Sequence, residues 1–132
     1  YCFATKFASV KLSELAIGIG PFVVGPAVER KIGTSAFSAM TINATKWFDS
    51  SWAREKGLYT EVFDSAIEMD AEIEKLADNL SNSNPEAMEE LKRVMWEGSK
   101  HWDTLLMERA ESSGKLVLSD FTKNAISKLK QK

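Results

Sequence analysis

The sequence predicts an α/β fold in which a short mixed segment, through residue 63, precedes an all-helical remainder. Three observations lead to this prediction. Apolar and polar residues alternate between residues 9 and 12, as in a half-buried strand. Glycines and prolines then divide the chain into short elements. From residue 62 onward, apolar residues recur at steps of three and four, which is the spacing of a helix face.

The composition is that of one small globular domain. The chain has 132 residues, 44% of them hydrophobic and 27% charged, and a formal net charge of −2. Such a balance gives no reason to expect nucleic-acid binding. One cysteine and one histidine leave no disulfide framework and no Cys- or His-rich metal site, so we expect no metal. The cysteine usage fits a reducing compartment, and we expect a cytoplasmic protein.

The first half is predicted as short strands and helices. "YCFAT" and "ASVKL" are strand candidates, and the glycines and Pro21 after Glu14 force a turn. Pro26 fits the first turn of a helix that Gly33 ends, and Thr34 has the chemistry of an N-cap for the next helix. The further elements expected are a helix over residues 35–42, a helix over residues 50–56 closed by Gly57, and the strand "LYTEVF".

The second half is predicted as helices. One stripe consists of Val62, Ala66, Met69, Ile73, Leu76 and Leu80. "SNSN" forms a turn, Asn84 caps the next helix, and Pro85 opens it. The inner face expected for that helix consists of Met88, Leu91, Met95 and Gly98, with Val94 beside it. "HWDTLLMERAESSGKLVL" and "SDFTKNAISKLKQK" are two more helices, the last capped by Ser119 or Asp120.

Such a layout suggests that part of a sheet is missing. Sheets of two or three short strands are marginal by themselves, and the chain starts at Tyr1 in apolar sequence rather than at Met. We therefore expect this sequence to be a fragment with further strands upstream.

The stretch "SELAIGIGPFVVGPAVERKIG" over residues 13–33 could belong to several kinds of site. Its apolar run from Leu15 to Val28 is too short and too often broken by Gly and Pro for a membrane span. Gly18 and Gly20 are followed by Val23 where a dinucleotide fingerprint needs its third glycine, so a plain turn is favoured.

Other candidate chemistries are weak. His101 is a lone histidine beside Trp102, and Cys2 lies in an apolar strand where thiols are usually inert. The tryptophans, Trp47, Trp52, Trp96 and Trp102, are better explained as core or interface anchors than as stacking platforms.

Glu14 is the most suggestive single residue. A carboxyl group that follows a strand and precedes Leu15, Ala16 and Ile17 should be partly desolvated, which disfavours its charged form and suits it to proton transfer near neutrality. A surface or helix-capping glutamate would give the same pattern, and local physics leaves both readings open.

The segment from Ala4 to Pro21 resembles the central segment of the crotonase superfamily, the enoyl-CoA hydratases and isomerases. The family pattern is roughly A-x-x-x-A-x-F-x-x-P-E-x-x-x-G-x-x-P, and the chain matches it without a gap at Ala4, Ala8, Glu14, Gly18 and Pro21. Later family landmarks are similar to Gly25, "RKIG" over residues 30–33, "AREKGL" over residues 53–58, Val62, "NPEAMEELKR" and "LSDFTKNAISKLKQK". The resemblance therefore covers the chain, but only the C-terminal half of a family member.

The resemblance implies a fold and a site. Residues 1–63 would form the end of a crotonase-like ββα spiral core, and residues 64–132 an all-helical oligomerisation region of a homo-trimer or hexamer. Glu14 would be the catalytic glutamate that exchanges a proton with the α-carbon of an acyl-CoA. The substrate-binding residues implied are Ile17, Gly18, Pro21 and Phe22. Coenzyme A would be part of the substrate, with no separate cofactor.

Other parts of the site would lie before Tyr1. The resemblance places there the partner glutamate of a hydratase, the main CoA-binding loop, and the two backbone N–H groups that stabilise the developing enolate as an oxyanion hole. The chain by itself would then be catalytically incomplete.

The chain also departs from the family pattern. Ser13 replaces the usual proline, Val10 the phenylalanine, Phe22 the glycine after Pro21, and Asn43-Ala44 a common T-G. Phe22 is the most telling because a bulky side chain there would reshape the acyl pocket or the water site. The segment over residues 13–33 is most similar to bacterial methylglutaconyl-CoA or enoyl-CoA hydratases. These enzymes act in branched-chain or fatty acyl-CoA catabolism. Isomerases, hydrolases and decarboxylases share the scaffold, so the reaction stays open.

A hypothesis of another class is a helical interaction module without chemistry, in which Glu14 is exposed and replaceable. Under the family interpretation, the candidate subunit contacts are Trp96, Trp102, Leu105 and Leu106. Thermal melting with and without CoA separates the two hypotheses, because only a ligand that binds the native state shifts the midpoint.

Overall fold

The computed structural model describes residues 1–130, and its first half combines short strands with short helices. The elements up to residue 63 are β1 (Phe3–Thr5), β2 (Ser9–Val10), the 3-10 helix η1 (Glu14–Ile17), α1 (Gly25–Ile42), β3 (Phe48–Asp49), α2 (Ser50–Glu55) and β4 (Glu61–Phe63). β1 pairs with β4 in parallel, with Ala4 opposite Val62, and β2 pairs with β3 antiparallel, with Val10 opposite Phe48. These pairings bring the two ends of the segment together.

A small hydrophobic core holds this segment together. It consists of Leu12, Ile32, Ala36, Met40 and Phe48. Three of these residues belong to α1, and Ala36 and Met40 share one face of its second helical piece. Leu12 lies two residues before Glu14, so the core anchors the chain directly ahead of the candidate catalytic residue.

The predicted break at Gly33 is present as a kink rather than as a loop. Gly33 has φ 76° and ψ 160°, outside the helical region, and the helix continues on both sides of it. Glycine adopts this conformation without the Cβ clash that other residues would meet. The Thr34 hydroxyl, expected as an N-cap, donates to the Glu29 carboxylate at 2.8 Å. Gly33 therefore separates two helical pieces of α1, as the sequence predicts.

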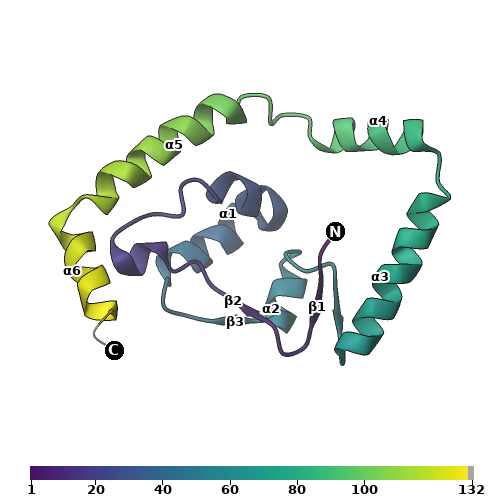
Figure 1. Cartoon of the computed structure of the whole chain (residues 1–132), viewed down its shortest axis with the longest axis horizontal. Coiled ribbons are helices and arrows are strands. Elements are labelled where there is room, and N and C mark those ends of the chain that lie inside the picture. The colour runs from purple at the N-terminus through teal and green to yellow at the C-terminus, as the bar shows by residue number, and fades with distance from the viewer. Residues whose placement is uncertain (131–132) are drawn as a thin grey trace.

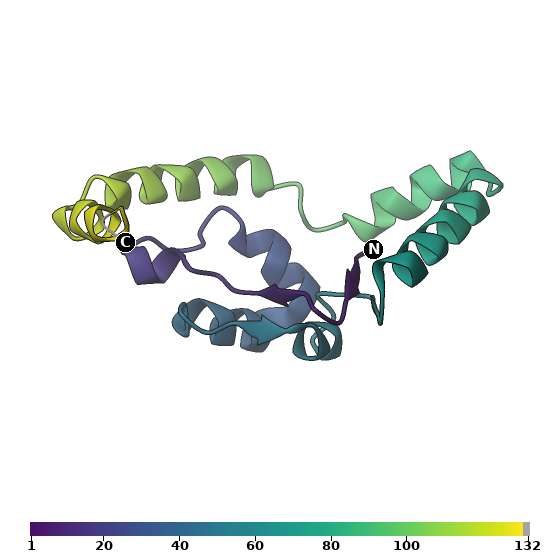
Figure 2. The ribbon, with the colours of Figure 1, turned by 60° about the horizontal axis from the view of Figure 1, so that its bottom comes forward.

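The second half of the chain is an arm of helices that curves around the core (Figure 1). Its elements are α3 (Ala66–Ser81), α4 (Pro85–Met95), α5 (Trp102–Val117) and α6 (Asp120–Leu129). α3 contacts β1 and β4 at one end of the arm, and α6 contacts η1 at the other. Seen from a second direction, α5 and α6 run along one side of the core, and α3 and α4 extend away from it (Figure 2). The arm thus returns to the segment that carries Glu14.

One set of contacts ties the middle of the arm to the core. The Arg30 guanidinium on α1 lies 5.4 Å from the Trp96 ring centroid and donates to the backbone oxygens of Met95 and Glu97. Trp96 also meets Trp102 edge to face, with ring centroids 5.8 Å apart. The end of α4 is therefore fixed against α1.

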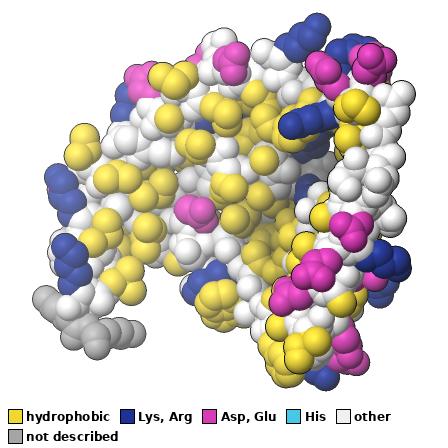
Figure 3. All heavy atoms as spheres, turned by 45° about the vertical axis from the view of Figure 1, so that its right-hand side comes forward, with side chains coloured by type: hydrophobic (Ala, Val, Ile, Leu, Met, Phe, Trp, Pro, Cys, Tyr) yellow, Lys and Arg dark blue, Asp and Glu magenta, His cyan; other side chains and the backbone are white. Residues whose placement is uncertain are grey.

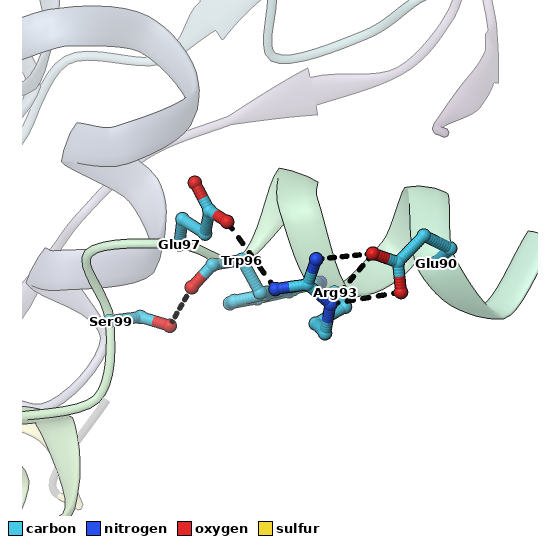
Figure 4. Close-up of polar contacts among 5 residues, drawn as sticks. All are labelled: Glu90, Arg93, Trp96, Glu97 and Ser99. Atoms are coloured by element: carbon cyan, nitrogen blue, oxygen red, sulfur yellow. Dashed lines mark hydrogen bonds and ion pairs between the residues drawn. The ribbon is translucent and has the colours of Figure 1, made fainter.

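Polar contacts also order the end of α4 itself (Figure 4). Arg93 donates to the carboxylates of Glu90 and Glu97, and the Ser99 hydroxyl donates to the Trp96 carbonyl at 2.6 Å. The hydrogen bond from Arg93 lowers the pKa of Glu90. All of these side chains lie at the surface, so they contribute little to stability.

Much apolar surface remains open on this arm. Figure 3 shows hydrophobic side chains over a large part of the face on which α3 lies. On α4, Leu91 is 59% exposed and Met95 is 60% exposed, so the predicted inner face of this helix is uncovered in the described chain. None of the described helices is long and apolar enough to cross a membrane.

Several predicted elements have other boundaries or other members in the structure. Val62 belongs to β4 and not to the helix stripe, which begins with Ala66 in α3. Gly98, expected on the inner face of the next helix, lies beyond the end of α4 with φ 85°. η1 and β3 were not predicted, because elements of two to four residues have no measurable period. The predicted last helix runs to Lys132, and residues 131–132 lie outside the described residues.

Candidate functional site

Glu14 stands at the first position of η1, directly after the strand segment. Gly18 ends this short helix in the left-handed region, with φ 84° and ψ 16°. The Gly18 N–H donates to the Leu15 carbonyl at 3.1 Å, and the Ile19 N–H donates to the Glu14 carbonyl at 3.0 Å. These two bonds close the turn and fix the backbone of Glu14.

One carboxylate oxygen of Glu14 is buried without a partner. Its Oε2 atom is shielded from solvent and makes no hydrogen bond to any of the described residues. Buried polar atoms are satisfied in most native structures, and an exception calls for an explanation such as a ligand or a catalytic role. The Glu14 side chain as a whole is partly buried, and its unpaired Oε2 atom makes it a candidate for proton transfer.

An open, mostly apolar groove of about 480 Å³ lies beside Glu14. Its lining consists of Glu14, Ile19, Gly20, Pro21, Phe22, Val23, Val24 and Ser113. All of these except Glu14 and Ser113 belong to the loop between η1 and α1, which we call the wall loop (residues 19–24). The arrangement places one ionisable side chain at the edge of an apolar groove, which suits proton transfer to or from a carbon acid.

The wall loop is tightly built. The Phe22 N–H donates to the Gly20 carbonyl at 2.7 Å, and the Gly25 N–H donates to the Pro21 carbonyl at 2.8 Å. The Phe22 ring lies against Gly20, so that a Cβ atom at Gly20 would overlap with it. Pro21 is buried, while Phe22 is 36% exposed. Phe22, Val23 and Val24 thus all contribute accessible surface to the groove.

The structure brings together three of the five residues expected at the site, namely Glu14, Pro21 and Phe22. Ile17 lies instead in a neighbouring pocket of about 520 Å³ between η1 and α6. Gly18 faces α6, where a Cβ atom would stand 2.5 Å from Phe121 Cδ1 and 2.8 Å from Thr122 Oγ1. Ile17 and Gly18 therefore contact the end of the arm rather than the Glu14 groove.

Ser113 is the lining residue that sequence reasoning missed. It comes from α5, about one hundred positions after Glu14, and its hydroxyl donates to the Arg109 carbonyl at 3.1 Å. The helical spacing of α5 gives no sign that this face meets the wall loop, because only the return of the arm brings them together. Ile19, Gly20, Val23 and Val24 were also missed as site residues, although they lie in the apolar run around Pro21.

The groove lining contains no histidine or cysteine, and no metal-binding cluster lies there among the described residues. Among residues 1–130, no group of three or more His, Cys, Asp or Glu side chains could hold a metal ion. His101 lies in a different pocket, with Trp102 and Arg30. Glu14 is the one ionisable side chain among the residues that line the groove.

Comparison with solved structures identifies the fold. An enoyl-CoA hydratase/isomerase from Pseudoalteromonas atlantica matches 98% of this chain with a TM-score of 0.87 at 17% identity. An enoyl-CoA hydratase from Mycobacterium avium matches 98% with a TM-score of 0.85 at 22% identity. An enoyl-CoA hydratase from Bacillus halodurans matches 95% with a TM-score of 0.85 at 19% identity. The expected crotonase-like α/β fold is therefore confirmed.

The chain spans about half the length of these solved structures, with 52%, 51% and 50% of them covered. No family model and no curated protein sequence matches the chain significantly. At these identities the likeness shows the fold alone, so the reaction has to be argued from the residues of the site.

Proposed function

We propose that this chain is part of an acyl-CoA-handling enzyme, an enoyl-CoA hydratase in which Glu14 transfers a proton at the α-carbon of the thioester. The observation that supports this most is the buried, partnerless Oε2 atom of Glu14 beside an apolar groove. The hydratase reaction adds a hydroxyl group to C3 and a proton to C2 of the enoyl thioester. A carboxyl group beside an apolar acyl chain is suited to supply that proton.

The wall loop would contact the acyl chain. Pro21 and Phe22 offer only apolar atoms to the groove from their side chains, and Ser113 lines it from α5. Because Phe22 is large, we propose that it limits the width of the acyl group, as a short or branched enoyl group would require. Ile17 and Gly18 would act indirectly, through the contact of η1 with α6.

The same proton-transferring carboxyl could serve an isomerase, which moves a proton between C2 and C4, or an acyl-CoA hydrolase. No residue of the groove favours these reactions over hydration, and the products distinguish them.

The oligomer that we propose is a homo-trimer or hexamer. The exposed apolar residues of α4 support an assembled state, because such a face is costly to leave in water.

The test is hydration of crotonyl-CoA by the protein produced from its complete gene. The rate is measured as the loss of enoyl thioester absorbance. We expect Glu14→Gln to lower kcat by about 10²- to 10⁴-fold, the range typical of a lost general acid or base. Glu74→Gln is the matched control, since Glu74 is an exposed glutamate on α3, remote in sequence from the groove. Equal rates for Glu14→Gln and the parent would refute the proposed role.

A further inference from the structure

The wall loop has a carbonyl group that the helix following it cannot satisfy. At the start of α1, the Gly25 N–H donates to the Pro21 carbonyl and the Val28 N–H donates to the Val24 carbonyl, each four residues back. The Phe22 carbonyl would take its bond in this series from residue 26. That residue is Pro26, which has no N–H to donate.

Arg109 of α5 supplies the missing donor. Its Nη1 atom donates to the Phe22 carbonyl oxygen at 3.3 Å, across 87 positions of the chain. The same atom would stand 3.4 Å from a Cβ at Gly25, so the guanidinium lies close to the first residue of α1. Hydrogen bonds from a charged donor are stronger than those between neutral groups. Within the described chain, Arg109 makes no ion pair that would compete for this bond.

This bond links both sides of the Glu14 groove. Ser113, one turn after Arg109 on α5, lines the groove and donates its hydroxyl to the Arg109 carbonyl. Phe22, whose carbonyl Arg109 holds, lines the groove as part of the wall loop. Arg109 itself does not line the groove, so its influence must pass through the position of Phe22.

We propose that Arg109 is a positioning residue of the acyl site, which holds the wall loop so that the Phe22 ring keeps its place beside Glu14. The proposal rests on the proposed function for its substrate, but the contact that carries it is independent of the reaction. Because Glu14 does not touch Arg109 in this arrangement, loss of the bond should weaken acyl binding more than proton transfer. The expected signature is a higher KM with kcat changed little.

The test compares Arg109→Gln and Arg109→Lys with Arg54→Gln in the protein produced from its complete gene. Arg54 is an exposed arginine on α2 that lines a separate surface pocket, so it serves as the matched control. Amide hydrogen exchange is followed over residues 19–28, and over residues 34–42 as a measure of intact folding. Steady-state kinetics with crotonyl-CoA give KM and kcat separately.

We expect Arg109→Gln to speed exchange in residues 19–28 only and to lower kcat/KM about ten-fold through KM, as loss of one charged hydrogen bond implies. Arg109→Lys should restore part of both, because the ammonium group can still donate, and Arg54→Gln should match the parent. Parental exchange in residues 19–28 of Arg109→Gln would overturn the proposal. A parent protein that hydrates no enoyl-CoA would contradict the proposed function instead, and the exchange result would still decide the role of Arg109.

Discussion

At the scale of single residues, the proposed chemistry depends on the environment of the Glu14 carboxyl group. Sequence alone singled out Glu14 but left it open between a catalytic and a structural role. In the structure, Glu14 Oε2 is buried and lacks a partner among the described residues, which favours the catalytic interpretation. Sequence could not supply this fact, because the burial of a single oxygen atom depends on the folded arrangement around it.

Two glycine variants test the backbone geometry of the turn at Gly18. Gly18→Ala should destabilise the protein by about 1–3 kcal/mol, because residue 18 has a positive φ and its Cβ would meet Phe121. Gly114→Ala is the control, since nothing lies near a Cβ at this position inside α5 and the change should stabilise by about 0.8–1 kcal/mol. Urea denaturation measures both, and equal effects of the two variants would contradict the turn geometry.

A second prediction at this scale concerns Phe22. If its ring limits the groove, Phe22→Ala should widen the range of acyl groups that the enzyme accepts. We expect kcat/KM for a longer or branched enoyl-CoA to rise relative to that for crotonyl-CoA, by about 10-fold for one or two added methylene groups. An unchanged ratio across a chain-length series would remove Phe22 from the acyl site.

At the scale of elements, the sequence predicted the longer pieces well. The helices that begin at Ser50 and Pro85 start as expected, and Ser119 is the cap that the sequence left open between two residues. The misses are η1 and β3, which are stabilised by contacts that no local pattern encodes. The position of Val62 was misjudged because an apolar residue at helical spacing can also end a strand.

The cap of α6 gives a test at this scale. Ser119 Oγ accepts a hydrogen bond from the Thr122 N–H at 3.3 Å and donates to the Thr122 hydroxyl at 3.1 Å, and Thr122 is fully buried. We expect Ser119→Ala to cost about 1 kcal/mol in the free energy of unfolding. Ser127→Ala, an exposed serine later in the same helix, should cost less. Thermal unfolding distinguishes them, and equal midpoints would show that the cap is not needed.

At the scale of the whole molecule, the arm determines what the core can do. α5 brings Arg109 and Ser113 to the wall loop, while α6 packs on η1 from the other side. Local sequence patterns could not predict this return, because it depends on contacts between residues nearly ninety positions apart. The resemblance in sequence gave the fold, and the comparison with solved structures confirms it.

The uncovered face of α4 leads to a prediction about assembly. Leu91 is 59% exposed on this helix, and Lys92 follows it on a different side. If the face is a subunit contact, Leu91→Glu should dissociate the oligomer, while Lys92→Glu, which also introduces a glutamate and makes the larger change in charge, should leave it intact. Sedimentation velocity reads out both variants. An oligomer that survives Leu91→Glu would place the contact elsewhere.

The central claim is that the Glu14 carboxyl moves a proton at the α-carbon of an acyl-CoA. The most direct measurement is deuterium incorporation at C2 when the protein produced from its complete gene hydrates crotonyl-CoA in D₂O, followed by mass spectrometry. We expect one deuterium at C2 of the 3-hydroxy product with the parent protein. Glu14→Gln should slow this incorporation at least about 100-fold. Incorporation at the parental rate in Glu14→Gln would contradict the central claim.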